Sequence, residues 1–448
     1  MKKITYVLLM TAMVFSSCRD YVEVDQPGKR TLKYTSDFQY ILNNTTNLES
    51  TFYYPELASD DIEIVDEEFI SRMSDVDKYA YAWADYIFID EEDRDWTRLY
   101  KQVYICNEVI TNVMSSAEGT ESEKNNIMGQ AKVHRAYAYY CLVNIYARQY
   151  DVATASSDPG VPLLTTPDLF ASLKRASVRE VYDLILQDLE DATGLLPDFQ
   201  DNSFMPSLAG TYGFLARVSL QIGDYDNALL NAEDALGLRN TLNNLEDYAN
   251  GSAYPVKYED PEILMAKGLG STVLDYRLSD ELTGLFDEND LRYELFTRPG
   301  TDITWNPFSG RVYWKPKLVY QGIYSGPTVP EMLLIKAECL ARSGDAAAAT
   351  EVLNTLRIAR FRAGDYEPLS VVDDVLPTVL DERRRELFGT GIRWFDLKRL
   401  NKEDRFAKTI SREFQGATYT LEPNANKYVF PIANIYISQN PEIEQNPR

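Results

Sequence analysis

Two segments of the chain carry the same helix–turn–helix pattern, and this repeat limits the folds that the chain can adopt. Leu215–Leu236 aligns with Ile335–Leu356, and each segment holds apolar residues at helical spacing. A Gly-Asp pair interrupts both patterns at the same place, beginning at Gly223 in one and at Gly344 in the other. Glycine ends helices and aspartate begins them, so each segment is predicted to be a pair of antiparallel helices.

These pairs resemble the tetratricopeptide unit, although the tryptophan and the closing proline of its full pattern are absent. Small residues such as Ala228 and Ala349 occupy matching positions, where they would let two helices approach closely. Helix pairs are therefore expected near 208–237 and 328–360. Such units stack and bury a continuous core, whereas two isolated helical hairpins would be the simpler alternative.

The rest of the chain also reads as mostly α, with irregular insertions. Ile127–Tyr150 has helical apolar spacing throughout, and Ser177 with Glu180 forms a capping box at the start of another helix. Long stretches near 150–170 and 236–330 are rich in proline, asparagine and tyrosine. None looks like a linker between independent domains. We expect one mostly α domain with a tetratricopeptide-like scaffold and loop-rich insertions.

The N-terminus has the pattern of a secretory signal. Lys2 and Lys3 precede Ile4–Phe15, an apolar run that would reach about 18 Å as a helix and is too short for a bilayer core of roughly 30 Å. Ser16-Ser17-Cys18 follows and resembles a bacterial lipobox. Residues 1–17 are predicted to be a signal peptide and Cys18 to be lipidated. An ordinary signal peptide with an incidental cysteine is the alternative.

The charge of the chain disfavours two classes of partner. Its 69 acidic residues outnumber its 45 Lys and Arg residues, giving a formal net charge of −24. Nucleic-acid affinity comes from basic contacts to phosphates, so nucleic acid is disfavoured. Electrostatic adhesion to anionic lipid is disfavoured for the same reason. Contact with a membrane is therefore expected through the N-terminal lipid only.

No cofactor or metal centre is predicted. The chain has one histidine, His134, which lies within a helical pattern and is expected to be structural. Acidic clusters at Asp90–Asp95 and Asp287–Asp290 could bind Ca²⁺, but neither has the spacing of an EF-hand, and solvated acid is favoured. Three cysteines lie among apolar neighbours and are expected to be buried thiols without a disulfide framework: Cys106, Cys141 and Cys339.

Four stretches together resemble the SusD/RagB family: Asp93–Val113, Ala131–Ala147, Glu382–Leu400 and Val429–Arg448. The run ERRRELFGTGIRWFDLKRL at Glu382–Leu400 is the most recognisable. Two positions depart from the pattern, because Ala433 stands where a second proline is common and Arg448 replaces a Gly-Tyr ending. The resemblance extends from the lipobox to the last residue.

Read from the residues alone, these motifs are mainly scaffold. Arg393 and Asp396 are three apart and are predicted to pair on one helical face. Trp394 and Leu397 share another face that suits packing. The strongest motifs are therefore not expected to form the ligand site.

The resemblance implies a function and a location. SusD-like proteins are surface lipoproteins of Bacteroidota that sit as a lid on a SusC-like TonB-dependent outer-membrane transporter. They capture glycans, or peptides in the RagB branch, and pass them inward. They are binding proteins and not enzymes, so no catalytic residue is predicted. The chain is expected to be lipid-anchored at the outer membrane and to face the cell surface.

A sugar ligand requires exposed aromatic planes together with polar side chains that bond its hydroxyl groups. The densest aromatic run, Tyr79–Tyr86, lies in an expected loop, and a second tryptophan stands beside turn-forming residues in TDITWNPFSG. The predicted ligand-binding residues, in order of preference, are Trp83 and Trp305, then Tyr81 and Asn306, then Asp60 and Asp61.

Three functions stay open at this point. The first is glycan capture without turnover. The second is peptide capture in the RagB manner, with affinity for mixed oligopeptides and none for glycans. The third is a lipid-anchored glycosidase, which needs only a pair of carboxylates and would release reducing ends.

Overall fold

The computed structural model describes residues 32–448 except 272–273, 305–306 and 316–319. The predicted signal peptide at 1–17 and Cys18 lie outside the described residues. Within the described part, no helix combines the length and the apolar character that crossing a bilayer requires.

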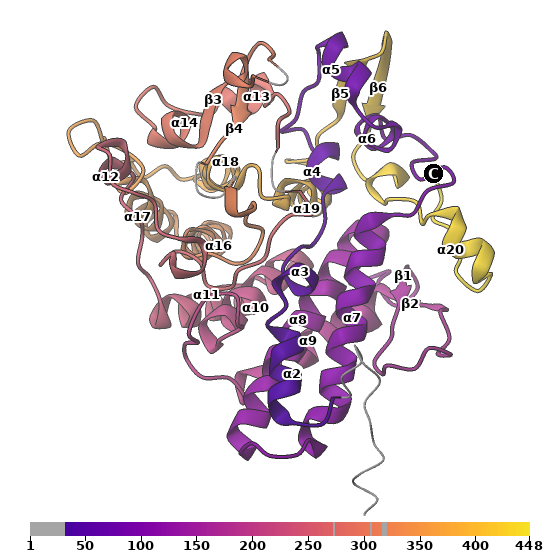
Figure 1. Cartoon of the computed structure of the whole chain (residues 1–448). Helices are drawn as coiled ribbons and strands as arrows, with labels where there is room; N and C mark the ends of the chain where they lie inside the picture. The colour runs from indigo at the N-terminus through magenta and orange to yellow at the C-terminus, as the bar shows by residue number, and fades with distance from the viewer. Residues whose placement is uncertain (1–31, 272–273, 305–306, 316–319) are drawn as a thin grey trace, which may run out of the picture.

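The described chain is mostly helical, with three small antiparallel sheets (Figure 1). The helices of the first half are α2 Thr35–Leu42, α3 Thr45–Leu48, α4 Tyr54–Ala58, α5 Glu67–Arg72, α6 Asp75–Tyr81, α7 Arg94–Asn112, η2 Val113–Ser115, α8 Glu121–Tyr146, α9 Val178–Thr193, α10 Leu208–Ile222 and α11 Tyr225–Leu238. Those of the second half are α12 Leu245–Ala249, η3 Lys257–Glu259, α13 Asp280–Thr283, α14 Leu291–Phe296, η4 Gly300–Asp302, α16 Val329–Ser343, α17 Ala346–Arg357, α18 Leu376–Leu387, α19 Ile392–Leu400, η5 Asn426–Tyr428 and α20 Asn434–Gln439. The strands are β1 Pro159–Pro162, β2 Arg175–Ser177, β3 Thr297–Pro299, β4 Arg311–Tyr313, β5 Ile410–Phe414 and β6 Ala417–Leu421.

Both repeat segments fold into the expected helix pairs, α10–α11 and α16–α17. Gly223 and Gly344 end the first helix of each pair at φ +81° and +90°, in the left-handed region that glycine adopts without strain. Asp224 and Asp345 then cap the second helix by accepting a backbone N–H three residues on, at 3.2 Å and 3.0 Å. The Gly-Asp turn is therefore a paired C-cap and N-cap.

The long helices pack side by side in chain order. α7 packs on α8, α8 on α9, α10 on α11, α11 on α16, and α16 on α17 and α18. Small side chains such as Ala228 and Ala349 are fully buried at these contacts. The scaffold is thus a stack of antiparallel helix pairs, as the sequence predicted. The segment with α13, α14, β3 and β4 lies beyond α18, whereas β1 and β2 lie beside α7 and α8 (Figure 1).

The central helix, α8, is fastened at both ends. Thr120 and Glu123 form a capping box at its start, and almost every residue from Ile127 onward is buried. At its end, Lys398 Nζ donates to the carbonyl of Ala147 at 2.8 Å, and Asn446 Nδ2 donates to the carbonyl of Tyr146 at 2.9 Å. Two family motifs that are distant in sequence therefore close one helix end.

The histidine and the three cysteines of the helical scaffold are structural, as expected. His134 is buried, and burial lowers its pKa well below the ordinary value. The three cysteines of the described chain are buried and unpaired, and burial raises the pKa of the Cys106 and Cys339 thiols to about 12. Thiols of this kind are unreactive.

Candidate functional site

The Asp60 and Asp61 carboxylates are buried in an ion-pair network and do not face solvent. Arg393 holds Asp60 with two hydrogen bonds of 2.7 Å and 2.9 Å, and Lys408 Nζ lies 2.8 Å from the same carboxylate. Arg384 pairs with Asp61 at 2.7 Å. Burial alone would raise the pKa of Asp60, but the surrounding cations hold it well below its usual range. This arrangement does not support a ligand role for either residue.

The same network corrects a prediction about the family motif. Arg393 and Asp396 do not pair with each other. Arg393 reaches Asp60, whereas Asp396 accepts from Arg383 at 2.8 Å and from Arg399 at 2.7 Å. Helical spacing alone predicted a local pair, but a buried acid from another element binds Arg393, and two other arginines bind Asp396. The motif therefore joins α18 and α19 to the early chain.

Trp83 and Tyr81 are also buried, so the expectation of an exposed aromatic platform there is wrong. Only 2% of Trp83 is exposed, its Nε1–H donates to the carbonyl of Ala58 at 3.0 Å, and the Arg412 guanidinium lies 3.9 Å from its ring centroid. The Tyr81 hydroxyl accepts the Ile64 N–H at 2.9 Å. The run was expected to be a loop, but α6 extends through Tyr81. These rings form an internal cation–π stack.

The two acidic clusters were expected to be solvated, which holds for Asp90–Glu92 and Asp287–Glu288 but not for their buried members. Asp93 and Asp95 are buried at the start of α7, where Asp93 accepts the N–H groups of Asp95 and Trp96. Burial raises the pKa of Asp93 to about 8. Asp290 is buried against Arg292 at 2.6 Å. Among the described residues, no group of His, Cys, Asp or Glu side chains is arranged to hold a metal ion.

Glu56 is a buried carboxyl whose protonation is coupled to folding. Its Oε2 accepts the Gly391 N–H at 2.8 Å. Burial raises the pKa of Glu56 to about 8, and the nearby charge of Asp61 adds to this effect. The folded protein therefore keeps this proton between about pH 4.5 and 8, whereas the unfolded chain releases it.

We expect Glu56→Gln to flatten the pH dependence of stability in that window. Because the folded pKa is raised, the contribution of Glu56 is fully present below about pH 4.5 and is lost as pH rises toward 8, at up to about 1.4 kcal/mol per pH unit. Urea unfolding at several pH values measures the slope. Glu190→Gln, at an exposed position, is the matched control. Equal slopes for wild type and Glu56→Gln would contradict the assignment.

Trp305 and Asn306 lie outside the described residues, so their predicted roles stay predictions. Their position along the chain is informative nevertheless. They belong to the connection between β3 and β4, which pair as an antiparallel hairpin with Arg298 opposite Val312. Trp314 directly follows β4, the second strand of that hairpin.

Three residues at the foot of this hairpin form an aromatic and cationic cluster, which we call the hairpin face: Arg298, Trp314 and Tyr320. The Arg298 guanidinium lies 3.3 Å from the Trp314 ring centroid. Tyr320 is 80% exposed and meets Trp314 edge-on, with ring centroids 6.3 Å apart. Arg298 Nε is buried, and within the described chain it has no hydrogen-bond partner. The hairpin face thus offers the exposed Tyr320 ring beside the stacked Arg298 and Trp314 side chains.

Sequence reasoning missed Trp314 and Tyr320. Both stand in the expected loop-rich insertion at 236–330, but Trp305 was preferred because turn-forming residues surround it. An available signal was the pattern W-K-P-K-L-V-Y, which places two aromatics around lysines and a proline. Such a segment combines ring planes with cations and resists regular structure.

The protein is a scaffold of stacked helix pairs whose loop-rich insertion presents aromatic side chains at the hairpin face. A family model described as starch-binding associating with outer membrane matches residues 12–220, and a model of the SusD family matches residues 329–448. The two matches leave only residues 1–11 and 221–328 uncovered. The chain belongs to the SusD/RagB family.

Two curated relatives align with most of the chain or with nearly all of it. Two SusD-like proteins of Formosa agariphila are each 24% identical; for one the alignment covers 99% of this chain and 98% of the relative, and for the other 78% of both.

Solved structures show the same fold. A SusD superfamily protein from Bacteroides thetaiotaomicron has a TM-score of 0.76 at 22% identity, covering 93% of this chain and 100% of that one. A SusD-like carbohydrate binding protein from Bacteroides vulgatus has a TM-score of 0.69 at 21% identity, covering 92% and 97%. A laminarin binding SusD-like protein has a TM-score of 0.66 at 19% identity, covering 93% and 99%.

Proposed function

We propose that this protein captures an oligo- or polysaccharide at the hairpin face and delivers it to a SusC-like TonB-dependent outer-membrane transporter, without cleaving it. The pairing of exposed Tyr320 with Trp314 beside Arg298 carries the proposal. Sugar rings present apolar faces that stack on aromatic planes, and their hydroxyl groups accept hydrogen bonds from guanidinium and ammonium groups. The names of the relatives, which include carbohydrate-binding and laminarin-binding proteins, support the same class of ligand.

The proposed location follows from the family and from the N-terminal pattern. Lipid on Cys18 would hold the protein at the outer-membrane surface beside the transporter. The test is detergent extraction of the full chain and of a Cys18→Ala variant from the outer membrane. The proposal requires that a SusC-like protein copurify with the full chain, and that the variant no longer partition with membranes.

We expect Trp314→Ala to weaken glycan binding by about 2 kcal/mol, or roughly thirty-fold in Kd, because a central aromatic contact contributes at least that much. Calorimetric titration with a panel of neutral and acidic oligosaccharides and mixed oligopeptides measures it. Phe170→Ala is the control, because this side chain is 96% exposed and belongs to the connection between β1 and β2, which lie away from β3 and β4 in Figure 1. Trp305→Ala tests the remaining sequence prediction in the same titration.

Each outcome of this titration has a defined meaning. If Trp314→Ala binds a glycan as tightly as wild type does, the hairpin face is not the glycan-binding site. Affinity for peptides alone would replace glycan capture with peptide capture. Oligosaccharides recovered intact after prolonged incubation support binding without turnover, and shortened products would show a glycosidase.

A further inference from the structure

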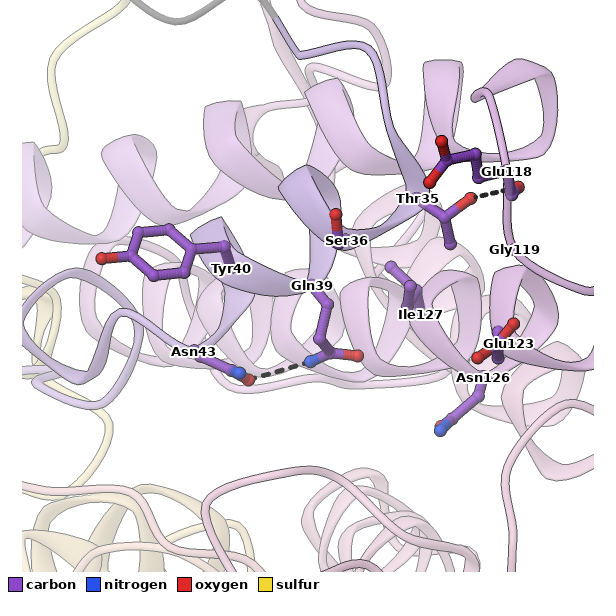
Figure 2. Close-up of a pocket in the computed structure, with 10 residues that line it drawn as sticks. All are labelled: Thr35, Ser36, Gln39, Tyr40, Asn43, Glu118, Gly119, Glu123, Asn126 and Ile127. Atoms are coloured by element: carbon purple, nitrogen blue, oxygen red, sulfur yellow. Dashed lines mark hydrogen bonds between the residues drawn. The ribbon is translucent and has the colours of Figure 1, made fainter.

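A second recess lies in the helical part of the molecule, between α2 and the start of α8 (Figure 2). Its volume is about 470 Å³, which is within the range of small-ligand sites. Ten residues line it: Thr35, Ser36, Gln39, Tyr40, Asn43, Glu118, Gly119, Glu123, Asn126 and Ile127. We call it the α2–α8 recess. In Figure 1 it belongs to the end of the molecule that holds α2, away from β3 and β4.

One wall of the recess is pinned in an unusual backbone conformation. Glu118 and Gly119 have φ values of +61° and +70°. The Thr35 hydroxyl donates to the carbonyl of Glu118 at 2.8 Å and fixes this turn, which Figure 2 shows opposite Tyr40 and Asn43. A non-glycine residue in the left-handed region costs free energy and persists where the surroundings determine it. The turn keeps the Glu118 side chain at the rim.

A chain of side-chain amides forms the floor. Gln39 Nε2 donates to Asn43 Oδ1 at 2.8 Å and to Gln130 Oε1 at 3.0 Å. Gln130, which is buried, donates back to Gln39 at 3.2 Å and on to Asn126 Oδ1 at 3.1 Å. Gln200 Nε2 also donates to Asn126 Oδ1, at 2.7 Å. Each amide is oriented by its neighbours, so the floor is rigid before any ligand arrives.

This row of side-chain amides leaves specific hydrogen-bond donors unused. The oxygens of Asn43 and Asn126 are engaged as acceptors, but their Nδ2 groups donate to no acceptor within the described part of the chain. Tyr40 is 78% exposed at one side of the recess, and the Glu118 carboxylate is exposed at the other. The recess therefore offers two fixed donors, an acceptor and an aromatic ring.

The charges of the recess select the class of ligand. None of the ten lining residues is Lys, Arg or His, whereas two are glutamates. The start of α8 does not favour an anion, because its capping box uses two of its amides and places the Glu123 carboxylate beside them. An acidic ligand would meet carboxylates and no cation. A neutral ligand with many hydroxyl groups can accept from the amides, donate to the carboxylate and lay an apolar face on the tyrosine.

We propose that the α2–α8 recess is a second binding site, for a neutral saccharide unit, distinct from the hairpin face. Asn43 and Asn126 bond its hydroxyl groups and Tyr40 stacks on its ring. Gln130 is a positioning residue that orients Asn126 directly and Asn43 through Gln39. With two sites on one chain, a long glycan is held at two points. The avidity gained depends on whether its length spans both sites.

The test uses the mature protein carrying Trp314→Ala, so that binding at the hairpin face is weakened while the recess is intact. The probes are laminarihexaose, maltohexaose and xylohexaose, with trigalacturonate as the acidic counterpart. Calorimetric titration is expected to show saturable binding of at least one neutral hexaose and no binding of the acidic sugar. Adding Asn126→Ala or Tyr40→Ala is expected to reduce that affinity at least ten-fold, whereas Tyr104→Ala, an exposed tyrosine on α7, leaves it unchanged.

Two further measurements separate positioning from folding. Gln130→Met should weaken the binding of the neutral hexaose as Asn126→Ala does. If this buried variant fails to fold, the exposed Tyr40 and half-buried Asn126 variants decide the matter alone. Absence of neutral-sugar binding in the Trp314→Ala background, or affinity that survives both Asn126→Ala and Tyr40→Ala, would overturn the second site. Neither result bears on the hairpin face, which the wild-type and Trp314→Ala comparison tests.

Discussion

Asp60→Asn is expected to lower the free energy of unfolding by about 3–5 kcal/mol, because removing one member of a buried ion pair leaves its partners uncompensated. The neutral amide keeps the size of the side chain but removes the charge that Arg393, Lys408 and Arg384 share. Urea unfolding at neutral pH measures the loss. The m-value should stay constant, since the surface exposed on unfolding does not change.

The control is Asp374→Asn, which breaks an exposed pair with Arg405 and should cost at most about 1 kcal/mol. Ligand affinity provides the second readout. If Asp60→Asn leaves stability unchanged but weakens glycan binding, then Asp60 contacts the ligand as its sequence position suggested, and the structural role is wrong.

Gly391→Ala is expected to cost about 2–5 kcal/mol, from two separate effects. Gly391 adopts φ +82°, a left-handed conformation that costs a non-glycine residue about 1–2 kcal/mol. A Cβ atom there would also lie 2.3 Å from the Phe52 ring and 2.9 Å from Leu269, and such overpacking costs about 1–3 kcal/mol. Thermal and urea unfolding measure the sum.

Gly344→Ala separates these effects. Gly344 has a similar φ of +90°, but a Cβ atom there meets nothing within 4 Å. It should therefore show the conformational cost alone, and the difference between the two variants is the cost of overpacking. Equal losses would mean that Phe52 moves aside without penalty and that packing around Gly391 is looser than the structure indicates.

The scaffold could be predicted from sequence because its signals are local. The Gly-Asp turns, the capping box at Ser177 and the apolar spacing of α8 each depend on neighbours within a few residues. Such signals are legible without knowledge of the tertiary fold. The helix pairs α10–α11 and α16–α17 accordingly formed where they were expected.

The candidate site could not be predicted in the same way, because exposure depends on contacts between distant segments. Trp83 was preferred for its aromatic neighbours, but Arg412, more than 300 residues later, covers its ring. Asp60 was preferred as a polar group in a short acidic stretch, but Arg393 and Lys408 enclose it. The amide chain of the α2–α8 recess joins residues from α2, α8 and the segment before α10, and no local pattern announces it.

The end of α8 has a consequence for how the chain is made. Asn446 bonds the Tyr146 carbonyl across 300 residues of sequence, and contacts so far apart form late in folding. A nascent chain that has already left the ribosome as far as α9 still lacks this donor. A product that stops before residue 446 loses this bond and keeps only the one from Arg175 Nη2 to the Tyr146 carbonyl, at 3.1 Å, so the loss costs about 0.5–1.5 kcal/mol. Truncated chains would therefore unfold more often than complete ones, and cellular proteases remove proteins in proportion to that population.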